Sequence, residues 1–134
     1  MPVQYEIDRE RRIIRTRCIE PVTVEEVVEH FCILARDPCC PKFVDVLLDL
    51  SEQTTIPTTE NLEEVTRAIR RVQSRVQFGA CAVVAYQDAL FGMLRMLEVF
   101  AERYFSETYV FRTKPEAEVW LASRHQTASA VRGD

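Results

Sequence analysis

Hydrophobic residues recur along this chain at two spacings, one typical of strands and the other of helices. Two short runs, 44–50 and 80–86, are nearly continuous in apolar residues and rich in Val, Leu and Ala. Such runs are typical of strands covered on both faces, as in a parallel sheet. A helical pattern separates them, so the chain predicts a right-handed βαβ unit at the centre of the fold.

The N-terminal residues alternate between apolar and polar positions, which is the period of a half-buried strand. Residues 3–8 and 12–19 show this pattern on either side of a short charged connection. Together they predict an antiparallel hairpin. Arg12, Arg15 and Arg17 should lie toward its solvated side or edge, where charge discourages aggregation.

Four segments carry apolar residues at helical spacing, and local signals mark where they begin. Thr23 and Thr113 are each followed three residues later by Glu, which is the capping-box pattern of a helix N-terminus. Asp88 is suited to cap a further helix. The predicted helices run from Thr23 to residue 37 at the latest, over about 60–76, over about 89–104, and from Thr113 to about 122, with a last strand at 107–112.

The predicted order of elements is ββαβαβαβα. It implies an α/β fold with a mixed, mostly parallel five-stranded sheet and helices packed against it. A chain of 134 residues with 47% hydrophobic and 28% charged residues is typical of one globular domain. We expect that domain to span 1–122, and the polar, aperiodic residues 123–134 to form a disordered tail.

The net charge and the hydropathy of the chain argue against two classes of partner, nucleic acids and membranes. The net charge of -4 argues against a nucleic-acid binder, which would carry a basic face. No apolar run approaches the roughly 20 residues of a membrane helix, and the N-terminus lacks the apolar core of a signal peptide. We therefore expect a cytoplasmic protein without a nucleic-acid partner or a membrane span.

Cysteine and histidine residues are the natural candidates for metal binding or nucleophilic catalysis. Five irregularly spaced cysteines in a reducing cytosol are expected to act as small hydrophobes. Cys39 and Cys40, with Cys32 and His30 upstream, lack zinc-ligand spacing, because adjacent cysteines rarely supply two ligands to one ion. Neither His30 nor His125 has a Ser or Cys partner at a defined position. We expect no catalytic residue, no metal and no cofactor.

Several short segments, taken with the element order, carry a resemblance to a known group of domains. They are the runs 44–50 and 80–86, Phe91-Gly92-Met93-Leu94-Arg95-Met96, the opening patterns Tyr5-Glu6-Ile7-Asp8 and Ile14-Arg15-Thr16-Arg17, and Val110-Phe111-Arg112. Over about residues 1–122 the chain resembles the STAS group (sulfate transporter and anti-sigma-factor antagonist), and most closely its small free-standing bacterial members of unestablished role. The resemblance implies a regulatory module without enzymatic activity. A more distant likeness to lipid-carrying CRAL-TRIO domains implies a small ligand.

Thr58 and Thr59 match, by position, the phosphorylatable Ser or Thr of the better-known STAS domains, which precedes a helix. Pro57 stands where those domains carry an acidic residue, and no glycine follows. A phosphate here would meet unpaired backbone amides and the positive end of the helix dipole. The alternative is that one of the two threonines caps the helix.

A second candidate site is the rim beyond the two buried strands, because ligands of open parallel sheets bind at the carboxyl ends of the strands. This rim would hold Asp49, Ser51, Gln87 and Asp88. The two carboxylates would repel a phosphate unless a metal intervened. Asp49 could equally accept hydrogen bonds from the amides of the following loop.

The helix predicted over 89–104 is apolar over a wider arc than one amphipathic stripe needs. One face must cover the sheet, and the remainder needs a neighbouring helix, a second subunit or an apolar ligand. The candidate interface or ligand-binding residues are Phe91, Met93, Arg95, Met96, Val99 and Phe100. Arg95 could anchor a ligand or form a structural ion pair.

Two functions fit these patterns. The first is a non-enzymatic cytoplasmic regulatory or protein-interaction module, homodimeric through an exposed apolar patch on the helix at 89–104. The alternative is a carrier or sensor of a small apolar ligand, which requires a pocket between that helix and the sheet. An enzyme would need convergent titratable groups in a cleft, and the motifs supply few.

Overall fold

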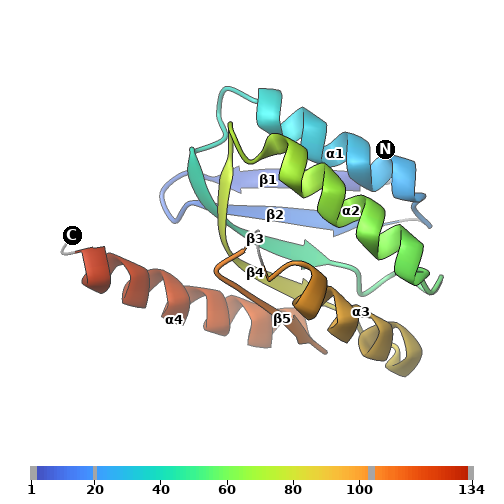
Figure 1. The fold of residues 1–134 in the computed structure, drawn as a ribbon. Helices are drawn as coiled ribbons and strands as arrows, with labels where there is room; N and C mark the ends of the chain where they lie inside the picture. Colours follow the sequence, from blue (N-terminus) through green and yellow to red (C-terminus); the bar gives the residue numbers. More distant parts are fainter. Residues whose placement is uncertain (1–2, 20, 103–104, 133–134) are drawn as a thin grey trace.

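A mixed five-stranded sheet forms the centre of the structure, a computed structural model that describes residues 3–19, 21–102 and 105–132 (Figure 1). The elements in chain order are β1 (Val3–Asp8), β2 (Ile13–Cys18), α1 (Val24–Arg36), β3 (Phe43–Asp49), α2 (Thr59–Val72), β4 (Gln77–Val84), α3 (Asp88–Phe100), β5 (Glu107–Phe111) and α4 (Lys114–Arg132). The strands lie in the order β1-β2-β3-β4-β5, with β1 antiparallel to β2 and the later pairs parallel. The predicted α/β class and the order ββαβαβαβα are therefore confirmed.

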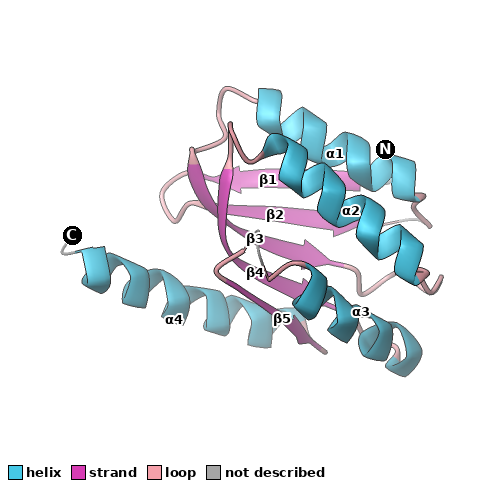
Figure 2. Ribbon diagram, in the orientation of Figure 1, coloured by secondary structure: helices cyan, strands magenta, loops and turns pink. Residues whose placement is uncertain are grey.

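The helices divide between the two faces of the sheet (Figure 2). Helices α1, α2 and α3 pack on one face, and α4 packs on the other, against β3, β4 and β5. Strand β4 serves both faces because its side chains alternate: Ala80, Ala82 and Val84 contact the cluster under α4, whereas Cys81 and Val83 face the three-helix side. This double burial explains why the strand is nearly continuous in apolar residues.

The N-terminal hairpin has the predicted pairing, but Arg15 is less solvated than the pattern suggests. Its guanidinium Nε and Nη2 donate to the two carboxylate oxygens of Glu118 on α4, at 2.7 and 3.0 Å. Nη1 donates to Asp8 at 3.1 Å. Arg15 therefore links β2 to the last helix and is half-buried, whereas the pattern predicts a position near the solvated side or edge of the hairpin.

Gly79 lies inside β4, whereas the sequence pattern places the start of that strand at residue 80. A Cβ atom at Gly79 would lie 2.3 Å from Oδ1 of Asp45 on β3. That same oxygen accepts a hydrogen bond from the Ala80 amide at 2.9 Å, next to a register shift between Val44 and Val46. Glycine is needed here because the Asp45 carboxylate closely approaches the neighbouring backbone.

Helix boundaries show three further differences from the predicted ones. The prediction that Asp88 caps α3 was wrong: Gln87 is the N-cap residue, it makes no side-chain cap bond, and the Asp88 carboxylate pairs with Arg112. Helix α2 ends at Val72. Helix α4 continues past residue 122 to Arg132, and the expected disorder of 123–134 stays a prediction.

Candidate functional site

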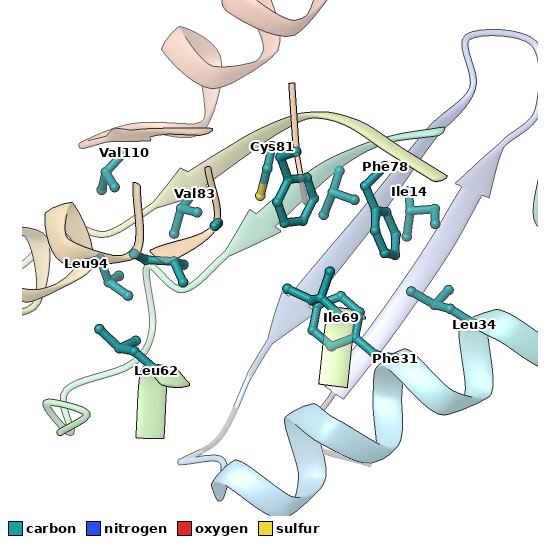
Figure 3. Packing of buried hydrophobic residues seen from close by; sticks show 14 of the residues in the cluster. Ile14, Phe31, Leu34, Leu62, Ile69, Phe78, Cys81, Val83, Leu94 and Val110 are labelled. Carbon is teal, nitrogen blue, oxygen red and sulfur yellow. The ribbon is translucent and has the colours of Figure 1, made fainter. Parts of the chain in front are cut away.

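An apolar cavity of about 160 Å³ lies between the sheet and the three helices on its α1–α3 face. Its walls come from elements far apart in sequence and include Phe31 of α1, Leu62 and Ile69 of α2, Leu94 and Leu97 of α3, and Cys81 of β4. Figure 3 shows the side chains of the sheet and those of the helices converging on one another. This apolar cavity lies beneath α3 and is bordered by the sheet and all three helices, so it is the candidate ligand site.

Helix α3 contributes to the cavity through one stripe. Leu90, Leu94, Leu97 and the following Ala101 line it, and all four side chains are buried. Their spacing of four, three and four residues places them on one face of the helix. The apolar excess in the sequence identified the right helix, but the candidate residues selected from it did not include these leucines.

The six residues that the sequence selected on α3 lie outside this stripe, and none of them lines the cavity. Phe91, Met93 and Phe100 are half-buried against the core, and the Arg112 guanidinium lies 4.2 Å from the Phe91 ring centre. Arg95 forms an ion pair with Glu98, as its structural interpretation expects. The other two, Met96 and Val99, are exposed.

One end of the cavity lies where parallel strands end at their carboxyl side. Val22 precedes α1, and Thr55 and Pro57 precede α2; all three line this end. Buried Gln53 joins these two loops, because its amide donates to the Cys18 carbonyl at 3.0 Å and accepts from the Val22 amide at 3.2 Å. The cavity thus reaches the edge at which open parallel sheets bind ligands.

The titratable groups of the cavity wall are kept neutral. Burial lowers the pKa of His30 to about 4, and its Nε2 lies 2.9 Å from Oγ1 of Thr16. Burial, with the nearby Asp45 carboxylate, raises the pKa of Cys81 to about 12. Burial also raises the pKa of Cys18 to about 11. These protonated thiols are poor nucleophiles, so the wall offers hydrogen bonding and apolar contact.

The predicted rim residues lie apart from the cavity. Buried Asp49 accepts from the amide and the hydroxyl of Ser51, at 3.0 and 2.6 Å, so it shapes the loop after β3. Gln87 and Asp88 are exposed at the start of α3, where Arg112 pairs with Asp88. None of the four lines the cavity.

Thr58 is the N-cap residue of α2. Its Oγ1 accepts from the Asn61 amide at 3.1 Å, and Oδ1 of Asn61 accepts from the Thr58 amide at 3.0 Å. The cap interpretation is thereby confirmed for Thr58, while Thr59 is the exposed first residue of the helix. Phosphorylation of either residue stays a prediction.

The sulfur and histidine residues form no recognisable metal centre in the described ranges. No three His, Cys, Asp or Glu side chains there are grouped so that they could hold a metal ion. All five cysteines are free thiols. The His125 side chain lies outside those that the structure describes. In the described part of the chain, no helix combines the length and apolarity needed to cross a bilayer.

Comparison of the chain with known protein families, with curated proteins and with solved structures finds no match. The resemblance to STAS domains therefore stays a prediction.

Proposed function

We propose that this protein is a non-catalytic carrier or sensor of a small apolar ligand, bound between the sheet and helices α1, α2 and α3. The observation that carries the proposal is the apolar cavity of about 160 Å³ in the core. The STAS-like assignment and the cytoplasmic location belong to the same proposal, and the observed element order supports the former. The neutral His30, Cys18 and Cys81 support a binding role over a catalytic one.

The energetic cost of the cavity favours an occupant. Substitutions that open enclosed cavities in protein cores cost about 24 cal/mol per Å³, so unfilled space of this volume costs at most about 4 kcal/mol. That is a large share of the roughly 5–15 kcal/mol by which domains are stable. A ligand of matching shape would recover part of this free energy on binding.

The cavity volume also limits the size of the ligand. Pockets for drug-sized molecules measure about 300–1,000 Å³, well above the value found here. An apolar cavity of about 150 Å³ is known to bind benzene and xenon. We therefore expect a compact ligand about the size of a single ring.

A cavity-filling substitution with a matched surface control tests this function. Val65 lines the cavity from α2, and Val119 on α4 is 72% exposed. Toluene should raise the melting temperature of the wild type and of Val119→Phe, because both keep the cavity, and should leave that of Val65→Phe unchanged. Differential scanning fluorimetry measures the shift, with circular dichroism to verify folding. Equal shifts in all three proteins, or none in the wild type, would contradict the proposal.

A homodimeric interaction module is the second candidate function. The observation that favours it is the pair Met96 and Val99 on α3, whose side chains are 39% and 68% exposed. Residues three positions apart are neighbours on a helix surface, so the two form one apolar patch. This patch faces away from the cavity stripe, so self-association and ligand binding can coexist.

A further inference from the structure

Thr108 of β5 contributes a hydroxyl group to the cavity wall that other groups leave unused. Its Oγ1 is buried, and no hydrogen-bond partner for it lies among the described residues. The buried polar side chains of Thr16, His30 and Gln53 at the cavity are paired, Thr16 with His30 and Gln53 with two backbone groups. Buried hydroxyls in proteins are normally hydrogen-bonded, so this exception needs an explanation.

The register of β5 places this hydroxyl on the cavity side of the sheet. Thr108 is the partner of Cys81 on β4, which also lines the cavity. The next residue, Tyr109, faces the other way, with its ring centre 6.1 Å from that of Trp120 on α4. Val110, two residues after Thr108, points from the sheet toward the three-helix side (Figure 3). The alternation of side chains along a strand thus directs Thr108 toward the ligand space.

The cavity wall around Thr108 determines whether the polar group of a ligand bound there can carry a charge. The wall is apolar apart from neutral hydrogen-bonding side chains, and an ionised ligand group would lose its hydration here without gaining a counter-charge. A threonine hydroxyl both donates and accepts. It can therefore pair with a neutral hydroxyl or N–H group at one end of an apolar ring.

We propose, on the basis of the ligand-binding function above, that the ligand is a neutral single-ring molecule of the phenol class. Its ring fills the apolar space, and its one polar group hydrogen-bonds to the Thr108 hydroxyl. Thr108 is then the residue that makes the cavity discriminate between a phenol and the corresponding hydrocarbon.

A comparison of two isosteric ligands on two isosteric proteins isolates this hydrogen bond. Phenol and toluene have nearly the same shape, as do Thr and Val, so Thr108→Val replaces the hydroxyl with a methyl group of similar size. The substitution should weaken phenol binding about tenfold and leave toluene binding equal or tighter. Dissociation constants from isothermal titration calorimetry or NMR titration give both effects.

The matched control is Thr66→Val on α2. Thr66 is also buried, but its hydroxyl donates to the Glu63 carbonyl at 2.9 Å, and the residue does not line the cavity. This variant should keep both wild-type affinities. Since it removes a similar buried hydroxyl, it also shows whether a general loss of stability alters ligand binding.

The outcomes separate this inference from the proposed function. Toluene binding to the wild type, with a phenol affinity that Thr108→Val leaves unchanged, overturns the role of Thr108 and keeps the apolar carrier. Tighter binding of benzoate than of phenol overturns the neutral class of ligand. Failure of toluene and phenol alike to bind the wild type overturns the carrier function itself.

Discussion

His30 shows how one residue couples the core to pH. Its side chain is 6% exposed, lies against the ring of Tyr5, and meets the Thr16 hydroxyl. Burial lowers its pKa from an ordinary 6.5 to about 4. The folded protein therefore holds a neutral imidazole at pH values at which the unfolded chain binds a proton.

The free energy of unfolding should consequently fall as pH drops from 6.5 toward 4. The sign follows because the unfolded state binds more protons in this window, so acid favours it. The full shift corresponds to about 3 kcal/mol. Urea unfolding at pH 7, 5.5 and 4.5 measures the fall. His30→Gln should flatten it, and an equally steep fall in that variant would show that another group is responsible.

A comparison of individual residues shows which candidate site residues can be predicted from the sequence. The two threonines at the start of α2 stand out because a capping residue is a local signal. Thr108 carries no such signal: it lies in an ordinary alternating strand, and its hydroxyl is buried only because distant elements enclose it. The same holds for the leucines of α3, which resemble any core residues until the packing leaves a space beside them.

At the scale of elements, the local sequence pattern predicted most helix N-termini and the strands. It did not predict where some of the helices end. Val76 continues the apolar period of α2, yet the helix ends at Val72 and a turn carries the chain into β4. Val76 is still buried after that turn, so the apolar pattern cannot reveal where the helix stops. Asp88 is not the cap because the helix begins one residue earlier than predicted, which places Asp88 inside its first turn, where it pairs with Arg112.

The start of α2 gives a test within one element. Thr58→Ala removes the capping hydroxyl and should lower the free energy of unfolding by about 1 kcal/mol. The adjacent Thr59→Ala should change it by less than about 0.5 kcal/mol, because that exposed side chain makes no cap bond. Urea denaturation of both variants measures the difference, and equal losses would argue against the cap.

At the scale of the whole molecule, the fold class followed from the sequence because each apolar period matched one type of element. The cavity did not, since its volume depends on how side chains from α1, α2, α3 and the sheet meet. The wide apolar arc of α3 indicated that this helix had more than one neighbour. Only the packing showed which stripe borders the cavity and which side chains remain exposed.

Self-association is a property of the whole molecule that the exposed patch on α3 allows us to test. We expect the wild type to be a dimer in size-exclusion chromatography with light scattering. Val99→Asp should give a monomer, because a charge cannot be buried in an apolar interface without a partner. Val119→Asp changes an equally exposed valine on α4 and should keep the dimer. A wild-type mass that stays monomeric at high concentration would end the dimer hypothesis.

The ion pair between Arg15 and Glu118 has a consequence for folding during synthesis on the ribosome. Every strand joins its predecessor in the chain, so the sheet can grow outward from the hairpin while translation proceeds. This ion pair joins residues 103 positions apart in the sequence, so it cannot form until α4 has left the ribosome. We expect nascent chains that still lack this helix to expose the apolar face of β3 and β4 that α4 covers in the complete fold. In that state they would most need a chaperone.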